Sequence, residues 1–239
     1  MINTGKREDV YQFIADKMNN ILKSCVFGTF VSSDYVTRKD VKKPVMTTFY
    51  NSEANPKETF NKHQLDAFYE SLDDTLPGGL DVMEAINAYW DYGSDVHMWT
   101  LPDGHVAKVP VTEMTNIRIE VDELNHRTFT YRYNKQQPSE NYRSLVANII
   151  HSIDGYIARE MVRRCHKLKI ELVHIHDCFL FNPDYLQIVC QTYKEILAEI
   201  ANRDLLSDIL SEIAGKYVKV TKHSTDLAKD ILNSEYMLS

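Results

Sequence analysis

The chain has 239 residues, 44% of them apolar, and a formal net charge of -7. This length allows one large or two small domains with a sizeable buried core. No apolar run approaches the roughly 20 residues of a membrane span, and the N-terminus has no signal-peptide character. The negative charge argues against a protein that only binds nucleic acid, because such proteins are usually basic.

The four widely spaced cysteines, which form no C-x-x-C pair, are Cys25, Cys165, Cys178 and Cys190. This pattern predicts a reduced, cytoplasmic protein without a cysteine-based zinc site. Charge is distributed unevenly, because residues 64–106 contain no Lys or Arg, whereas basic residues cluster at 38–43 and 159–169. Contact with a polyanion is expected at these two clusters, and the alternative for each is a solvated helix face.

Helical periodicity dominates the first part of the chain. Apolar residues at helical spacing predict helices at 9–25, 34–51, 62–71 and 81–92. One of the residues 32–34 could open the second helix, and Pro44 should disturb it. Asn55-Pro56 marks a break, and Leu76-Pro77-Gly78-Gly79 indicates a turn.

The periodicity changes near Val96, and alternation predicts two hairpins with strands at 97–100, 105–111, 115–121 and 127–133. A long helix follows at 144–167. Two short strands flank Asp177, at 170–175 and 178–182. A helix at 184–203, extendable to 213, precedes a short strand at 217–220. Together these elements indicate an α+β fold that is mainly helical.

Asp177 follows an apolar strand pattern, at the point where the chain must turn back on itself. Carboxylates presented in this way can hold a magnesium ion. Taken alone, this segment is weak evidence for a metal site, because a His-Asp pair in a hairpin is common and usually structural.

Arg38, Lys42 and Tyr50 lie 4 and 8 residues apart. On a helix they would spread over roughly 120° of one face, and Arg38 to Tyr50 would span about 18 Å. Two cations at one end could meet the phosphates of a nucleoside triphosphate, and the aromatic ring could lie against sugar and base. The alternative is an ordinary basic helix with a core tyrosine.

Four blocks in the right order resemble the single-subunit RNA polymerases of the bacteriophage and mitochondrial type. The blocks are Arg38-x3-Lys42-x2-Val45-Met46-Thr47-x2-Tyr50-x-Ser52, Asn148-x-x-His151-Ser152-x-Asp154-Gly155, His176-Asp177-Cys178-Phe179 and Asp226-Leu227-x3-Ile231-Leu232-x-Ser234-x-Tyr236. The resemblance implies right-hand polymerase fingers and part of the palm. It divides the chain into a fingers-like region at 1–104, a specificity-loop-like hairpin at 105–136 and a palm part with a C-terminal foot at 137–239.

The resemblance also implies roles for individual residues. Asp177 would bind metal, Arg38 and Lys42 would contact the triphosphate, Tyr50 would help to select ribose over deoxyribose, and His151 would touch the product hybrid. The hairpin at 115–133 lies where the family reads promoter DNA, although an exposed structural hairpin is an equal alternative. The basic residues that could contact DNA there are Arg118, Arg127, Arg132 and Lys135.

Two positions depart from the family pattern: Asn51 replaces the usual Gly, and Pro44 lies inside the motif helix. The family's other metal-binding aspartate belongs to a segment that would precede residue 1. Two-metal catalysis needs carboxylates that bridge both ions, and Asp177 alone cannot do this. We therefore expect a split enzyme in which a second subunit supplies the other aspartate and shares two Mg²⁺ ions.

These inferences predict a catalytic subunit of a DNA-directed RNA polymerase, phage-encoded and acting in the cytoplasm of an infected host cell. Its partners would be the second subunit, NTPs, the DNA template and the RNA product, with no membrane. A non-catalytic, polymerase-derived scaffold or nucleic-acid-binding subunit is one alternative. A DNA polymerase of the related fold is another, but those enzymes usually place Glu after the His-Asp pair, where this chain has Cys178.

Overall fold

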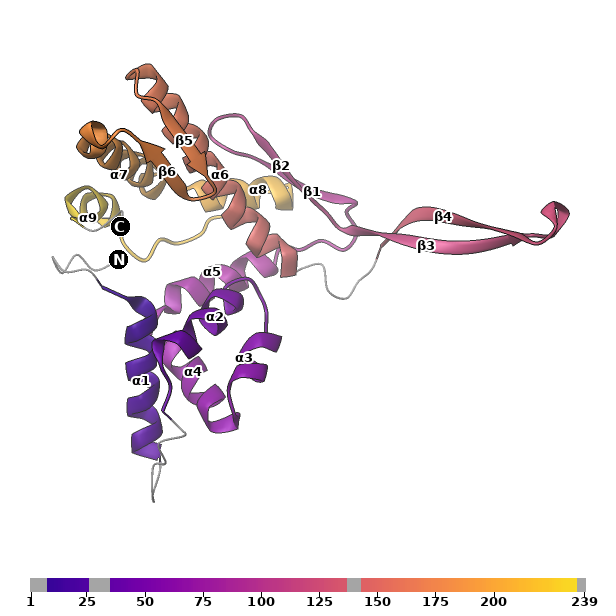
Figure 1. The fold of residues 1–239 in the computed structure, drawn as a ribbon, viewed down its shortest axis with the longest axis horizontal. Helices are drawn as coiled ribbons and strands as arrows, with labels where there is room; N and C mark the ends of the chain where they lie inside the picture. Colours follow the sequence, from indigo (N-terminus) through magenta and orange to yellow (C-terminus); the bar gives the residue numbers. More distant parts are fainter. Residues whose placement is uncertain (1–7, 26–34, 137–142, 236–239) are drawn as a thin grey trace.

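The computed structural model describes residues 8–25, 35–136 and 143–235, and it confirms the predicted α+β class with mainly helical content. Two helical bodies and one long projecting hairpin are visible in the ribbon (Figure 1). The N-terminal body contains α1 Val10–Cys25, α2 Arg38–Thr48, α3 Ala54–Thr59 and α4 Lys62–Thr75. Helix α5, Pro77–Asn87, packs against both bodies, through Leu80 at one end and Ile86 at the other.

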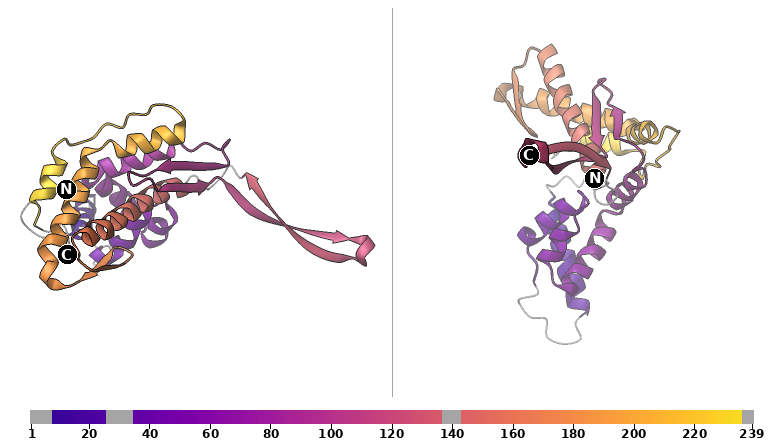
Figure 2. Two further views of the ribbon diagram at one scale, coloured as in Figure 1. Left: turned by 90° about the horizontal axis from the view of Figure 1, so that it is seen from above. Right: turned by 90° about the vertical axis from the view of Figure 1, so that its right-hand side faces the viewer.

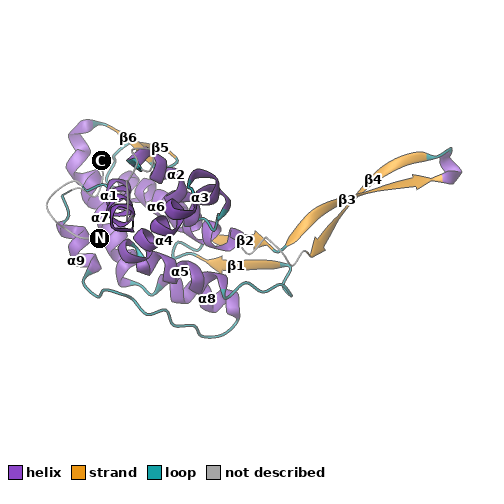
Figure 3. Ribbon diagram, turned by 90° about the horizontal axis from the view of Figure 1, so that it is seen from below, coloured by secondary structure: helices purple, strands orange, loops and turns teal. Residues whose placement is uncertain are grey.

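The C-terminal body is built on four helices: α6 Arg143–Lys167, α7 Leu186–Asn202, α8 Leu205–Ala214 and α9 Leu227–Asn233. In the described residues the strands form three separate antiparallel hairpins. They are β1 Val96–Thr100 with β2 Val106–Pro110, β3 Thr112–Val121 with β4 Arg127–Gln136, and β5 Leu172–Ile175 with β6 Cys178–Phe181. The β3–β4 hairpin extends away from both bodies (Figures 2 and 3).

Each body has its own hydrophobic core. In the N-terminal body, helices α1, α2 and α4 each contribute apolar pairs at i and i+4, which lie on one helix face: Ile14 and Met18, Val41 and Val45, Phe68 and Leu72. The C-terminal core surrounds α6, and its fully buried side chains include Trp99, Leu145, Ile149, Met161, Ile196, Ile209 and Leu210. Trp99 also donates its indole N–H to Ser152 Oγ at 3.0 Å, which fastens the β1–β2 hairpin to α6.

Helix α2 begins at Arg38 rather than near residue 34, and the residues 32–34 expected to open it lie outside the described ranges. Thr37 precedes the helix, and the Asp40 carboxylate accepts hydrogen bonds from the Thr37 N–H and hydroxyl at 2.9 and 2.6 Å. These bonds lower the pKa of Asp40. The helix neither begins nor ends at Pro44, which is buried within it.

Four other expectations differ from the structure. The predicted turn at 76–79 is wrong, because α5 begins at Pro77, a residue suited to the first helical position. Asn55-Pro56 lies within the short helix α3 rather than at a break. The helix expected at 184–203 ends at Asn202 and does not extend to 213, because the separate helix α8 begins at Leu205. Residues 217–220 form no strand, and the backbone N–H groups of Val218 and Val220 donate instead to the hydroxyls of Ser211 and Ser207.

Asn19 fixes the segment that leads into α2. Its buried side-chain amide donates to Val36 O at 2.8 Å and accepts from Val36 N at 2.9 Å. We expect Asn19→Ala to lower the free energy of unfolding by about 1–3 kcal/mol, because it leaves two buried backbone groups without partners. Chemical denaturation measures this loss. The control is Asn20→Ala, because Asn20 is the exposed neighbour of Asn19. An equal loss of stability in Asn20→Ala would contradict the role assigned to Asn19.

Candidate active site

Asp177 lies in the two-residue loop of the β5–β6 hairpin, whose last strand pair is Ile175 and Cys178. This is where the sequence placed it. His176, the first loop residue, has a φ of 56°. That left-handed conformation costs a non-glycine residue about 1–2 kcal/mol, and the favoured turns of two-residue hairpin loops require it at this position. The Asp177 side chain is exposed, as expected for a group that meets a ligand.

Tyr50 and His151 are brought together from positions far apart in the sequence. Their rings stack with centroids 5.4 Å apart and an interplanar angle of 14°. Tyr50 follows the C-terminal end of α2 in the N-terminal body, and His151 belongs to α6 in the C-terminal body. The stack therefore joins the end of the motif helix to the helix that carries the second sequence block.

Asn51 holds the turn after Tyr50. Its φ of 62° is left-handed, a conformation that Gly adopts freely and Asn tolerates better than most residues. The Asn51 and Asn87 side chains also exchange two hydrogen bonds, of 2.8 and 3.1 Å, which tie the turn to the end of α5. Asn51 therefore has the backbone conformation that would explain a Gly at this position, and it adds a side-chain anchor.

Asp154 is a member of the site that sequence reasoning missed. It lies three residues after His151 on α6, so both belong to one helix face. Partial burial and the nearby charge of Asp177 raise the pKa of Asp154, against the opposing effect of His151. Burial together with Asp154 and Asp177 also raises the pKa of Tyr193 on α7. Two signals in the sequence point to Asp154: its place in the block Asn148-x-x-His151-Ser152-x-Asp154-Gly155 and its i, i+3 spacing from His151.

The two carboxylates are therefore electrostatic neighbours. A divalent cation would relieve the repulsion between Asp177 and Asp154, because the ion's own charge dominates its surroundings. Asp177 and Asp154 are accordingly the residues near the hairpin that could hold a metal. Among the described residues, however, neither belongs to a ready-made group of three ligands.

The cations of α2 lie in the other body. Arg38 Nε donates to Asp9 Oδ2 at 2.6 Å, and the guanidinium carbon lies 5.5 Å from the centre of the Tyr11 ring. Lys42 is exposed and forms no ion pair with any residue in the described part of the chain. The stack of Tyr50 on His151 is the contact that relates this helix to the side of the molecule that holds Asp177.

The arginines of the second basic cluster are paired with carboxylates of the protein, whereas Lys167 and Lys169 are exposed. Arg159 Nε donates to Asp103 Oδ2 at 2.5 Å, which lowers the pKa of Asp103. Arg163 and Arg164 both pair with the buried Glu160, and Arg164 also makes two hydrogen bonds to Glu199, of 2.8 and 2.6 Å. Arg159 joins α6 to the β1–β2 turn and Arg164 joins it to α7, whereas Arg163 pairs within α6, so carboxylates of the protein already match the three arginines of this cluster.

The β3–β4 hairpin matches the predicted strands and extends them to Thr112 and Gln136. Its register places Arg118 and Arg132 on one face, because their cross-strand partners are Thr130 and Asn116. The other two basic candidates, Arg127 and Lys135, belong to the opposite face, together with the exposed apolar residues Ile117, Ile119, Phe129 and Tyr131. Their contact with DNA stays a prediction.

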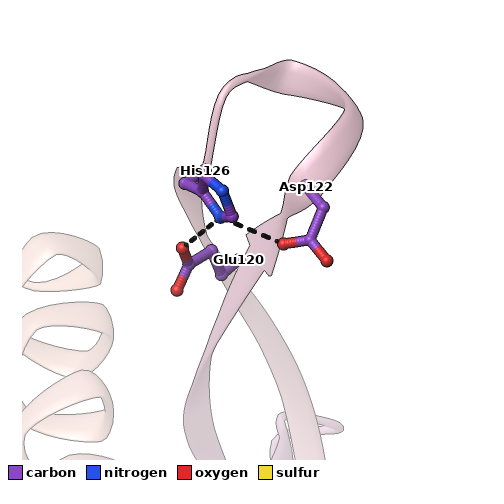
Figure 4. A group of neighbouring side chains, drawn as sticks. All are labelled: Glu120, Asp122 and His126. Carbon is purple, nitrogen blue, oxygen red and sulfur yellow. Dashed lines mark ion pairs between the residues drawn. The ribbon is translucent and has the colours of Figure 1, made fainter.

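Glu120, Asp122 and His126 gather at the tip of this hairpin (Figure 4). His126 Nδ1 lies 3.0 Å from Glu120 Oε1 and 3.2 Å from Asp122 Oδ1. Within the described ranges, this is the group of three side chains close enough to share a metal ion. All three are exposed, and the contacts of His126 with the two carboxylates account for the arrangement.

Comparison with known protein families matches residues 91–237 to DNA-dependent RNA polymerase. The match contains the Asp177 hairpin and the His151 block, and it begins after Arg38, Lys42 and Tyr50. No curated protein matches the chain. No helix in the described residues has the length and apolarity needed to cross a membrane. The matched residues make up more than half of the chain, which therefore belongs to the DNA-dependent RNA polymerase family.

Proposed function

We propose that this chain is a catalytic subunit of a DNA-directed RNA polymerase that adds NTPs to an RNA 3′ end on a DNA template. The observation that carries the proposal is the stack of Tyr50 on His151. It unites a residue outside the family match with one inside it, and the family resemblance implies a role at the incoming nucleotide for Tyr50 and at the product hybrid for His151. A basic helix with an ordinary core tyrosine would not require this contact, and Tyr50 is 39% exposed.

In this proposal each site residue has one task. Arg38 and Lys42 bind the triphosphate, because cations neutralise the charge that moves onto the leaving pyrophosphate. Tyr50 selects ribose, and His151 contacts the product hybrid. Asp177 binds metal. Residues 1–104 act as fingers, 105–136 as the specificity hairpin and 137–239 as part of the palm.

The residues around Asp177 fit magnesium in part. When bound, two Mg²⁺ ions would activate the attacking oxygen and stabilise the leaving one. Asp177 supplies an exposed carboxylate for this purpose, and Asp154 is a second acid whose raised pKa reflects partial burial and the charge of Asp177. The chain's own contribution is to hold these oxygens in the strained β5–β6 turn and on the adjacent helix.

A partner chain with a further aspartate completes the proposed site. Support comes from the outer face of the β5–β6 hairpin, where Val173, Ile175 and Leu180 are 61%, 59% and 52% exposed. The opposite face, with Leu172, Phe179 and Phe181, packs on the C-terminal core. An exposed apolar patch typically marks an interaction surface. Here it adjoins the carboxylate that needs a companion.

Asp177→Asn should lower RNA synthesis by the assembled polymerase at least about a thousandfold, because loss of the carboxylate charge removes a metal ligand. Primer extension with Mg²⁺ measures the rate. The subunit should still assemble with its partner. Asp184→Asn applies the same change to an exposed acid just beyond the hairpin, and it should leave the rate unaltered. Unchanged turnover in Asp177→Asn would remove Asp177 from the site.

Tyr50→Phe should keep the ring stack on His151 and lose only the hydroxyl. We expect discrimination against deoxynucleotides to fall by about tenfold, roughly the worth of one hydrogen bond. The ratio of kcat/KM for an NTP and its dNTP measures this change. Tyr217→Phe, at a residue 83% exposed, serves as the control. Identical selectivity in the Tyr50 variant would contradict the assigned role.

Purified alone, the chain should be inactive in nucleotide addition, and a co-purifying chain should restore Mg²⁺-dependent synthesis. Val173→Lys should raise the concentration of that chain needed for half-maximal activity by about tenfold or more, because a charge is then buried at the apolar face. Val106→Lys is the matched control, since Val106 is an exposed valine of another hairpin. Robust synthesis by the isolated chain would overturn the split site.

A further inference from the structure

We propose that Asp9 is a positioning residue that, together with Tyr11, holds the Arg38 guanidinium ready for the triphosphate. This inference rests on the proposed function of Arg38. Neither Asp9 nor Tyr11 belongs to the sequence blocks that resemble the polymerase family, and both lie outside the matched residues. The support therefore comes from the contacts that these residues make.

Asp9 uses both carboxylate oxygens. Oδ1 accepts the backbone N–H groups of Tyr11 and Gln12, at 3.0 and 3.2 Å, which caps the N-terminal end of α1. Oδ2 accepts Nε of Arg38, at 2.6 Å, across 29 positions of sequence. The carboxylate is thus fixed to the backbone of one helix while it binds a side chain of another. A side chain that only balanced charge would not need the first attachment.

The contacts of Arg38 leave much of its guanidinium available. In the part of the chain that the structure describes, its hydrogen bond goes through Nε to Asp9, and the two terminal nitrogens have no such partner. The Tyr11 ring lies 5.5 Å from the guanidinium carbon, within the range of a cation–π contact. One edge of the planar group is therefore held, and the terminal nitrogens keep the donors that bind phosphate.

The ion pair has little to offer as a source of stability. The Arg38 and Asp9 side chains are 45% and 39% exposed, and exposed pairs contribute about 0–1 kcal/mol. Its effect on ligand binding can be larger, because a flexible side chain that is already ordered loses less entropy when it meets the phosphate. Hydrogen bonds from Arg38 and the α1 backbone lower the pKa of Asp9, despite the opposing effect of partial burial, so the carboxylate is ionised at neutral pH.

Asp9→Ser tests the ion pair with Arg38 apart from the N-cap of α1. Serine is also a good N-cap, so α1 keeps its cap while the ion pair is lost. In the assembled polymerase we expect KM for NTP to rise about two- to fivefold, the factor that corresponds to an exposed ion pair, with kcat nearly constant. Asp9→Glu keeps the charge and should restore part of the affinity. The folding midpoint should stay within error for both variants.

Asp74→Ser is the matched control. It breaks the 2.9 Å ion pair between Lys17 and Asp74, which also joins α1 to another helix and does not touch Arg38. KM should not change. In an Arg38→Ala background, Asp9→Ser should have no further effect, because the positioned group is already absent.

The outcomes distinguish the proposed triphosphate contact of Arg38 from the positioning role of Asp9. If Arg38→Ala raises KM but Asp9→Ser leaves it unchanged, Arg38 binds the triphosphate without the help of Asp9, and the positioning role is overturned. If Asp9→Ser lowers KM, the carboxylate competes with phosphate, which also overturns it. If Arg38→Ala itself leaves KM unchanged in an active enzyme, the proposed triphosphate contact fails, and the inference fails with it.

Discussion

The contact between Tyr50 and His151 is the interaction on which the candidate site depends. The two hydrophobic cores are separate, and helix α5 packs on both of them, through Leu80 at one end and Ile86 at the other. Two further contacts start from the turn after α2: the ring stack joins it directly to α6, and the paired amides of Asn51 and Asn87 join it to the end of α5. Tyr50 and His151, for which we propose roles near the nucleotide, therefore also contribute to the contact between the two bodies, and a substitution at either residue should affect both properties.

The elements with clear periodicity were predictable from sequence, and the contacts between them were not. Alternation located the hairpins, and the position of Asp177 in a two-residue loop followed from it. Pro77 was misjudged because the two glycines after it suggest a turn, although proline suits a helix start. Residues 217–220 alternate like a strand, but Ser207 and Ser211 supply the hydrogen-bond partners. Asp154 was overlooked because its neighbour Asp177 is brought close only by the fold.

Part of the chain's acidic charge is used in ion pairs within the protein. Asp74 pairs with Lys17 and Asp103 with Arg159, so acids of the segment that lacks Lys and Arg neutralise cations from distant parts of the sequence. In the described residues, the cations without such partners include Lys42 on α2 and Arg118 and Arg132 on the projecting hairpin. A chain with a net charge of -7 can thus present positive charge at selected places.

Two kinds of incompleteness meet at the β5–β6 hairpin. Electrostatically, Asp177 has a carboxylate neighbour in Asp154, whose pKa is raised partly by their repulsion. Hydrophobically, the outer face beside it exposes apolar side chains while the inner face is packed. A metal ion alone would relieve the repulsion between the carboxylates but leave the apolar face exposed. An apolar partner alone would cover the face but leave the repulsion. A polypeptide segment that brings an aspartate on an apolar strand would cover the apolar face and add a ligand for the cation that relieves the repulsion, which is why we propose a shared site.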